Sequence, residues 1–138
     1  MQDMQVHHVG YLVKKIDRAI IAFKELGYRK ETEIIFDEHR GIDICFLLKD
    51  GYRVELVSPK SKESVVYELQ KKYGNSPYHI CYNCENIEMS IKELRSNGYV
   101  QYDIPHEAIA LNNRNVCFLI HPYLGMIELL EESKNELL

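Results

Sequence analysis

The sequence lacks an excess of basic charge. Its 138 residues include 17 lysines and arginines against 21 aspartates and glutamates, which gives a formal net charge of −4 and a pI of about 5.9. A domain that binds nucleic acid normally presents a basic face, so this balance argues against DNA or RNA as a partner. The apolar fraction of 46% is ordinary for a globular domain and excludes a mainly disordered chain.

The sequence also lacks a long apolar run. None approaches the roughly 18–20 residues that a helix needs to cross a bilayer. The opening residues, Met1-Gln2-Asp3-Met4-Gln5, are too polar for a signal peptide. We therefore expect no membrane segment and a cytoplasmic location.

Cysteines are few, and each lies in an apolar stretch that is typical of a strand: Cys45, Cys81, Cys84 and Cys117. Without a secretory signal, buried free thiols are the expectation. Cys81 and Cys84 have the CxxC spacing of zinc and redox sites, but residues three apart in a strand point to opposite faces. The spacing therefore favours two structural thiols over a metal or redox pair.

An internal repeat is the most informative feature present. Residues 8–28, HVGYLVKKIDRAIIAFKELGY, align without a gap with residues 79–99, HICYNCENIEMSIKELRSNGY. The match resumes later with an extra residue in the second copy: FLL leading to Glu55 corresponds to FLI leading to Glu128. The chain is therefore predicted to hold two copies of one half-domain, related by a pseudo-twofold axis.

The residue patterns predict the order β-α-β-β-β for each half, and hence an α+β fold. In the first module, residues 5–58, Asp17 is expected to lie at the start of a helix and Gly27 to end it, between strands at 5–13, 28–36, 42–48 and 52–57. The second module, residues 77–131, repeats this order with a helix at 87–97 and strands at 77–84, 99–104, 115–120 and 126–130.

A linker of residues 59–76 separates the two modules. We expect it to hold a short helix at about 65–73, which packs Val65, Leu69 and Tyr73 against the domain. The whole chain, 1–138, is thus expected to be one domain.

One ionisable residue interrupts the apolar pattern in each of four strands: His8, Glu55, His79 and Glu128. Taken singly, each residue has an ordinary structural explanation. The two glutamates could face solvent, because burying a carboxylate without a partner costs several kcal/mol. The repeat favours another arrangement, in which the two halves bring two imidazoles and two carboxylates together. That set suits a divalent transition ion, and it leaves open positions for water or substrate if the ion is octahedral.

The remaining histidines fit this pattern less well. Strand alternation puts His7 on the opposite face from His8, and the repeat selects His8 because Tyr78 stands in the place of His7. Three others lie at predicted loops or turns, where solvated side chains are expected: His39, His106 and His121.

Four segments resemble the vicinal oxygen chelate superfamily over residues 6–131, and they follow one another along the chain in the order expected for that family. HHVGYLVKKIDRA resembles the family's first metal strand and helix, and VCFLIHPYLGMIELLE its final strand pair. YRVELVSP and SPYHICYNCENIE are similar to the central segments of methylmalonyl-CoA epimerases. The resemblance implies two βαβββ modules that form the incomplete barrel of the glyoxalase/bleomycin-resistance fold.

The resemblance also implies a metal-dependent lyase or isomerase that moves a proton α to a carbonyl through a metal-bound enediolate. The family's metal positions fall on His8, Glu55, His79 and Glu128, which implies one divalent ion (Zn, Ni, Co or Mn). Glu128 corresponds to the carboxylate that moves the proton, and Asp43 is a candidate second base for an epimerase. A homodimer is implied as well, and an open sheet with exposed edges favours such pairing.

The substrate stays open between an α-ketoaldehyde–thiol adduct, as for glyoxalase I (lactoylglutathione lyase), and an acyl thioester, as for methylmalonyl-CoA epimerase. Leu12 and Val13 replace an expected arginine and Pro59 an expected asparagine, which weakens the glutathione assignment. Residues 108–114 lack the glycines typical of epimerases, which weakens the coenzyme A assignment. Asn113 and Arg114 are candidate substrate contacts.

Two other functions compete with the metal enzyme. A metal-free small-molecule or antibiotic-binding module has the same fold, but the four ligand-type residues argue against it. The third function is a ring-cleaving dioxygenase. Members of that class look like iron sites with two histidines and one glutamate, in longer chains. The fourth ligand-type residue, Glu55, and the short length of this chain disfavour it.

Overall fold

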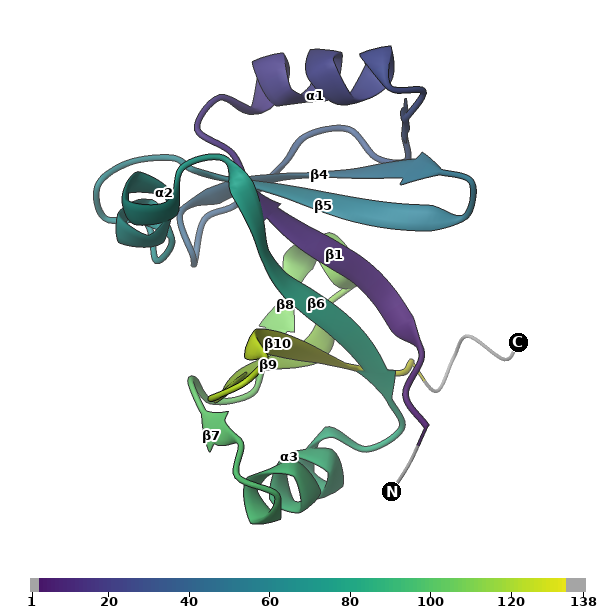
Figure 1. Cartoon of the computed structure of the whole chain (residues 1–138), viewed down its shortest axis with the longest axis vertical. Helices are drawn as coiled ribbons and strands as arrows, with labels where there is room; N and C mark the ends of the chain where they lie inside the picture. Colours follow the sequence, from purple (N-terminus) through teal and green to yellow (C-terminus); the bar gives the residue numbers. More distant parts are fainter. Residues whose placement is uncertain (1–2, 134–138) are drawn as a thin grey trace. The chain divides into compact units, whose positions relative to one another are not determined.

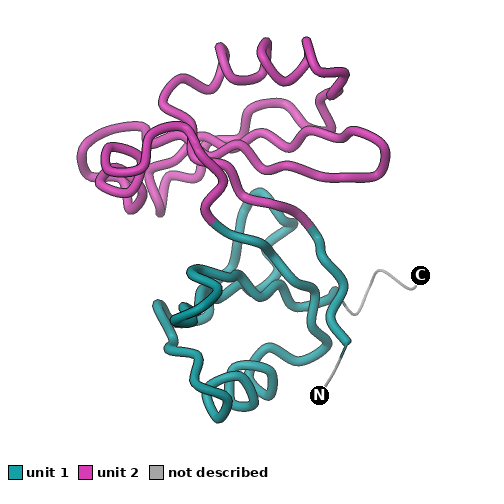
Figure 2. The backbone as a smooth tube through the Cα atoms, in the orientation of Figure 1, with its two compact units in different colours: residues 1–7, 79–138 teal, residues 8–78 magenta. Residues whose placement is uncertain are grey.

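The structure is a computed structural model that describes residues 3–133 of the chain (Figure 1). It falls into two compact units (Figure 2): unit 2 is residues 8–78, and unit 1 is residues 1–7 with 79–138. Residues 1–2 and 134–138 of the expected domain lie outside the described part.

Unit 2 is built on a sheet in the order β2-β4-β5-β1, and β3 also pairs with β4. β1 runs parallel to β5, whereas β4 and β5 form an antiparallel hairpin. Its elements are β1 (Val6–Leu12), α1 (Ile16–Glu25), β2 (Arg29–Lys30), β3 (Ile35–Asp37), β4 (Ile42–Lys49), β5 (Tyr52–Pro59) and α2 (Tyr67–Tyr73).

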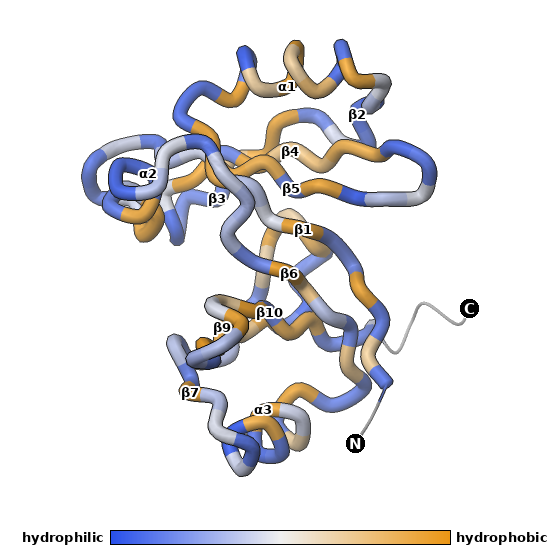
Figure 3. Tube along the Cα trace, in the orientation of Figure 1, coloured by the Kyte–Doolittle hydropathy of each residue, from blue (hydrophilic) through white to orange (hydrophobic). Residues whose placement is uncertain are grey.

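The core of unit 2 lies between α1 and one face of this sheet. Ile16 and Ile20 recur at helical spacing, and they pack with Cys45, Leu47 and Leu56 of the hairpin. Figure 3 shows the apolar stretches of β4 and β5 and the hydrophilic turn that joins them. Burial of this apolar face stabilises the unit and fixes the strand that carries Glu55.

Unit 1 repeats this arrangement, with the sheet order β6-β10-β9-β7 and β8 also paired with β9. β6 runs parallel to β10, and β9 is antiparallel to β10. Its elements are β6 (Ser76–Cys84), α3 (Ile87–Ser96), β7 (Val100–Gln101), β8 (His106–Ala108), a 3₁₀ turn (Ile109–Leu111), β9 (Arg114–His121) and β10 (Gly125–Glu131).

The core of unit 1 has the same construction. Ile91 and Leu94 of α3 pack with Cys117, Leu119 and Leu129 of the sheet. Asn86 caps the helix, because its side chain accepts a hydrogen bond from the Met89 N–H. The α+β class and the repeated β-α-β-β-β order are confirmed.

The predicted third element of each half is different in detail. Residues 28–36 and 99–104 are each predicted to form one strand. In the first segment the structure gives β2 and β3 with a break between them, and in the second it gives β7 and a break, with β8 beginning only at His106. The break has a side-chain cause: Thr32 Oγ1 accepts from the Phe46 N–H at 3.1 Å, and Asp103 Oδ1 accepts from the Phe118 N–H at 2.7 Å. A side-chain oxygen replaces a backbone carbonyl at this point, so the ladder is interrupted.

Of two further predictions near the helices, the position of Asp17 at the start of the first helix is confirmed, whereas the contacts of the linker helix need correction. Asp17 lies in the first turn of α1, and the residue at the N-cap position is Lys15, which makes no side-chain cap. The linker helix forms and packs on β5. Its buried residues are Gln70 and the N-cap residue Val66, whereas of the predicted contacts Leu69 is partly buried and Val65 and Tyr73 are more than half exposed. No helix within residues 3–133 is long and apolar enough to cross a membrane.

Candidate metal centre

In unit 2, β1 and β5 bring His8 and Glu55 together. The His8 Nε2 atom lies 3.3 Å from Glu55 Oε1, and the two residues are only 1% and 6% exposed. Gly10 is the register partner of Glu55, and Gly10 lies two residues beyond His8, so both side chains are on the same face of the sheet.

In unit 1, β6 and β10 bring His79 and Glu128 together in the same way. The His79 Nε2 atom lies 3.1 Å from Glu128 Oε1, and the two residues are 4% and 3% exposed. Cys81, two residues beyond His79, is the register partner of Glu128. The offset along the parallel strand pair is therefore the same in both units.

A phenylalanine adjoins each pair, and the prediction missed it. Phe46 is the register partner of Glu55, and its ring meets the His8 ring edge-on at 5.5 Å. Phe118 is the partner of Glu128, and its ring meets the His79 ring at 5.2 Å. The FLL and FLI segments of the repeat contained this signal. The rings hold each imidazole in one orientation and lower the local dielectric.

The spacing within each pair fits neighbouring ligands of one ion. With nitrogen and oxygen about 2.1 Å from a transition ion, adjacent ligand atoms are about 3.0 Å apart in an octahedron and about 3.4 Å apart in a tetrahedron. The observed 3.3 Å and 3.1 Å fall within this range. Imidazole with carboxylate is also a donor set that zinc, nickel, cobalt and manganese accept.

Asp43 is not brought to either pair. It lies on β4 as the register partner of Ser58, three residues before Phe46, so its side chain is on the opposite face from Phe46 and Glu55. Its carboxylate instead makes a 3.2 Å ion pair with Lys60. We therefore leave Asp43 out of the proposed site.

The candidate substrate contacts Asn113 and Arg114 have structural surroundings. Arg114 Nε donates to the Glu131 carbonyl at 2.8 Å, and Asn113 occupies a left-handed turn with φ of 60°. Tyr11 meets Phe23 of α1 edge-on at 5.3 Å, and Tyr82 packs against the core of unit 1. Both tyrosines thus pack in the interior of their units.

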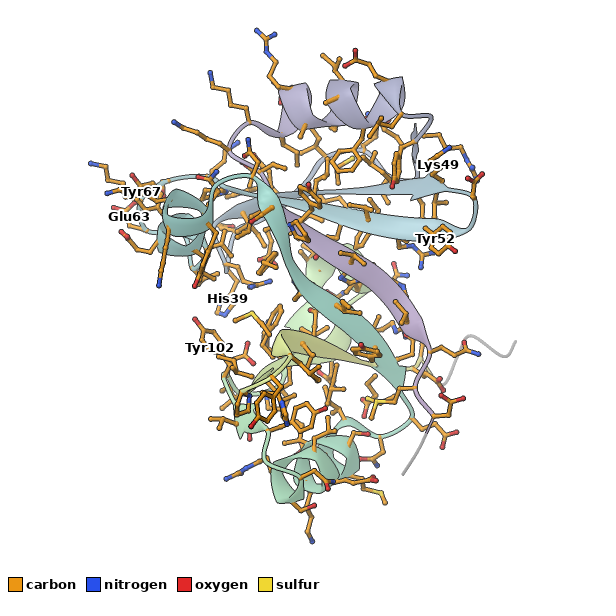
Figure 4. The ribbon with its side chains drawn as sticks, in the orientation of Figure 1. His39, Lys49, Tyr52, Glu63, Tyr67 and Tyr102 are labelled. Atoms are coloured by element: carbon orange, nitrogen blue, oxygen red, sulfur yellow. The ribbon has the colours of Figure 1, made fainter. Side chains whose placement is uncertain are left out.

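The histidines expected at the surface differ among themselves. His39 is exposed, and Figure 4 labels it beside the sheet of unit 2. His106 lies 3.7 Å from the Asp103 carboxylate. The His121 ring is tilted against the rings of Tyr99 and Tyr123, with centroid distances of 4.6 Å and 5.8 Å.

As predicted, the four cysteines are buried, and none forms a disulfide within residues 3–133. Burial raises the pKa of the Cys84 thiol to about 11 and that of Cys117 to about 12. Burial also raises the pKa of Cys45. Cys81 and Cys84 lie together on β6, as the strand interpretation of CxxC requires. The raised pKa keeps Cys45, Cys84 and Cys117 protonated, and protonated thiols are poor metal ligands and poor nucleophiles.

Comparison with known proteins assigns the family. The sequence model of the Glyoxalase/Bleomycin resistance protein/Dioxygenase superfamily matches residues 7–118. The chain belongs to this superfamily. The match includes His8, Glu55 and His79 and ends before Glu128, so it carries no information on that residue.

Individual relatives are named as epimerases. The chain is 26% identical over 93 residues to human mitochondrial methylmalonyl-CoA epimerase, which covers 66% of this chain and 52% of that protein. It thus spans about half the length of that curated relative.

Two solved structures share the fold. Methylmalonyl-CoA epimerase from Mycobacterium tuberculosis has a TM-score of 0.78 and 24% identity, over 93% of this chain and 87% of that one. A variant of the Streptomyces coelicolor methylmalonyl-CoA epimerase, in complex with 2-nitronate-propionyl-CoA, has a TM-score of 0.80 and 20% identity, over 96% and 99%.

Proposed function

We propose that this protein is a metal-dependent enzyme that moves a proton at the carbon α to the carbonyl of an acyl thioester, an epimerase of the methylmalonyl-CoA type. The observation that carries the proposal is the pair of buried His–Glu contacts at matching positions of the two units. The names of the sequence relatives favour the acyl thioester over the thiol adduct of a ketoaldehyde.

In this proposal His8, Glu55, His79 and Glu128 together hold one divalent ion. A buried carboxylate is costly unless it is paired, and a repeat that places one imidazole and one carboxylate on matching strands supplies four ligands if the halves converge. A bound divalent ion supplies Lewis acidity, which lowers the cost of negative charge on a carbonyl oxygen.

Glu128 has the second role of moving the proton. A carboxylate has two oxygens, so Glu128 can bind through one and accept a proton on the other. Phe118 and His79 cover Glu128, which is 3% exposed, so bulk water does not compete with a substrate for this carboxylate. Glu55 has the equivalent position in the other unit, and it is the residue that we propose as the second carboxylate of the centre.

Proton exchange in deuterated water tests this function directly. The purified protein, loaded with Co²⁺, should exchange the α-proton of methylmalonyl-CoA, as followed by NMR. Glu128→Gln should reduce the exchange rate at least 100-fold, because general base catalysis contributes about 10²–10⁴-fold. The exposed Glu107 provides the matched control, and Glu107→Gln should leave the rate unchanged.

The same assay separates the alternatives. Exchange with methylglyoxal–thiol adducts but not with the acyl thioester would move the assignment to the glyoxalase type. If neither substrate exchanges and no metal binds, the metal-free binding module would replace the enzyme. A cytoplasmic location and a homodimer stay predictions, which fractionation and light scattering check.

A further inference from the structure

Two adjoining cavities lie on unit 2, outside the His–Glu pairs. One, of about 430 Å³, has Tyr11, Phe23 and Ala22 in its wall, and we call it the apolar cavity. The other, of about 690 Å³, lies between the end of β5 and α2, and we call it the cationic cavity. Lys14 and Asn75 line both, so the two cavities share a wall.

The cationic cavity concentrates positive charge in an acidic chain. Lys14, Lys60, Lys62 and Lys71 line it, and no acidic residue does among residues 3–133. The ammonium of Lys60 is paired with Asp43, but those of the other three make no ion pair within the described chain. Like charges gathered without carboxylates repel one another, and a bound anion relieves that repulsion.

The shared wall adds a fixed neutral donor. Asn75 Oδ1 accepts from the Lys14 N–H at 2.9 Å and from Gln70 Nε2 at 3.4 Å. Both bonds go to the carbonyl oxygen, so they fix the orientation of the amide and leave its two Nδ2 hydrogens without a partner in the described chain. Lysine ammoniums and an amide NH₂ are all donors, which is the set that phosphate oxygens accept.

The apolar cavity supplies the complementary surface. Tyr11 and Phe23 meet edge-on at 5.3 Å, and Ala19 and Ala22 present small side chains beside them. Lys15 and Arg18 complete the cation set at its rim. Six of the chain's 17 lysines and arginines thus line the two cavities. A flat ring fits such a wall, and its charged substituent reaches the lysines.

The apolar cavity and the His8–Glu55 pair lie on different faces of the sheet. On β1, Tyr11 is three residues beyond His8, so it points to the α1 side, away from His8. Figure 4 labels Tyr67, which lines the cationic cavity, at the α2 end of unit 2. A ligand of these cavities therefore need not be the molecule that reacts at the His–Glu pairs.

We propose that the two cavities together bind a phosphorylated ligand of the nucleoside diphosphate class, with its flat ring in the apolar cavity and its phosphates among the lysines. The same chemistry is present in a free nucleotide and in the nucleotide end of a coenzyme A thioester. Only the second source rests on the proposed function.

Calorimetry with pyrophosphate and ADP tests the charge assignment on the full chain at fixed ionic strength. Lys62→Glu/Lys71→Glu should weaken both ligands at least tenfold, because each substitution removes an attractive charge and adds a repulsive one. The exposed Lys24 and Lys92 give a control with the same change in net charge, and Lys24→Glu/Lys92→Glu should weaken binding less than twofold. Equal weakening by the two double variants, or no binding to the wild-type chain, would overturn the proposal.

A second pair of variants tests the ring. Ala22→Trp fills the apolar cavity from the exposed side of α1, and it should reduce ADP affinity to that of pyrophosphate without changing pyrophosphate binding. Ile21→Trp, at the neighbouring exposed position, should change neither ligand. ADP affinity that is unaffected by Ala22→Trp would overturn the assignment of the ring.

The two sources are separated by kinetics. If the ligand is the nucleotide end of a substrate, Lys62→Glu/Lys71→Glu raises KM for the acyl-CoA but not for the matching acyl-pantetheine. If it is a free nucleotide, KM is the same in variant and wild type, and ADP binding alone is lost. Calorimetry with Glu128→Gln should give wild-type ADP affinity, so failure of the proposed reaction leaves the cavity assignment intact.

Discussion

In each half, a side-chain oxygen interrupts a strand by accepting a backbone N–H. These two hydrogen bonds allow us to predict how much each contributes to the free energy of unfolding. Asp103 and Thr32 occupy equivalent positions, 71 residues apart, and accept the N–H of Phe118 and Phe46. The Asp103 bond is shorter, 2.7 Å against 3.1 Å, and its acceptor is charged. A hydrogen bond to a charged group contributes about 1.5–3 kcal/mol and a neutral one about 0.5–1.5 kcal/mol.

Asp103→Ala should therefore lower the free energy of unfolding by about 2 kcal/mol, and Thr32→Val by about 1 kcal/mol. For a chain of this length, 1 kcal/mol corresponds to about 3 °C in Tm, so the expected losses are about 6 °C and 3 °C. Urea unfolding followed by circular dichroism measures the change in free energy for each variant, and thermal unfolding measures the change in Tm.

The control is Asp103→Asn, which keeps an acceptor oxygen and should recover more than half of the loss. Asp103→Ala and Asp103→Asn with equal stabilities would refute the reasoning, because the acceptor would then contribute nothing. A larger loss for Thr32→Val than for Asp103→Ala would refute the ranking by charge.

Three other predictions concern the reactivity of the thiols, the pH dependence of stability and the N-cap of α3. All four cysteines should resist a thiol reagent in the native protein at about pH 8 and react at once in denaturant, because all four are buried and burial raises the pKa of Cys45, Cys84 and Cys117; fast native reaction of two or more would contradict this. The unfolded chain loses thiol protons above the ordinary pKa of 9.0, while the folded pKa values are about 11 for Cys84 and about 12 for Cys117. The stability they contribute is therefore complete below pH 9 and is lost between pH 9 and 12, which a pH series of urea unfolding checks. Asn86→Ala should reduce the free energy of unfolding by about 1 kcal/mol, and Asn86→Ser should not, since serine also caps.

The sequence was sufficient to predict the elements that rest on hydrophobic periodicity. Both long helices and the strands that carry His8, Glu55, His79 and Glu128 are where the apolar pattern places them. The internal repeat was more informative about the site than hydrophobic periodicity. It selected His8 over His7, and it matched Glu55 with Glu128, although each glutamate taken alone would be expected to be exposed.

The parts that were missed depend on tertiary contacts. Thr32 breaks residues 28–36 by accepting a hydrogen bond from the Phe46 N–H of β4, and the sequence of that segment alone does not show that this donor will lie beside it. The face to which Asp43 points depends on strand register, which a shift of one residue reverses. The linker helix forms as predicted, but its buried contacts were predicted wrongly for a related reason, since Val65 and Val66 are both apolar and only the packing of the folded chain decides which is buried. The cationic cavity joins Lys14 to Lys71, which lie far apart in the sequence.

The central claim is that four residues from the two units share one ion, and Co²⁺ titration with elemental analysis tests it most directly. The account predicts one ion per wild-type chain, and a loss of at least 100-fold in affinity for both Glu55→Gln, from unit 2, and His79→Ala, from unit 1. Two ions per chain, or a variant of one unit that leaves binding by the other unchanged, would show two independent pairs and contradict the shared centre.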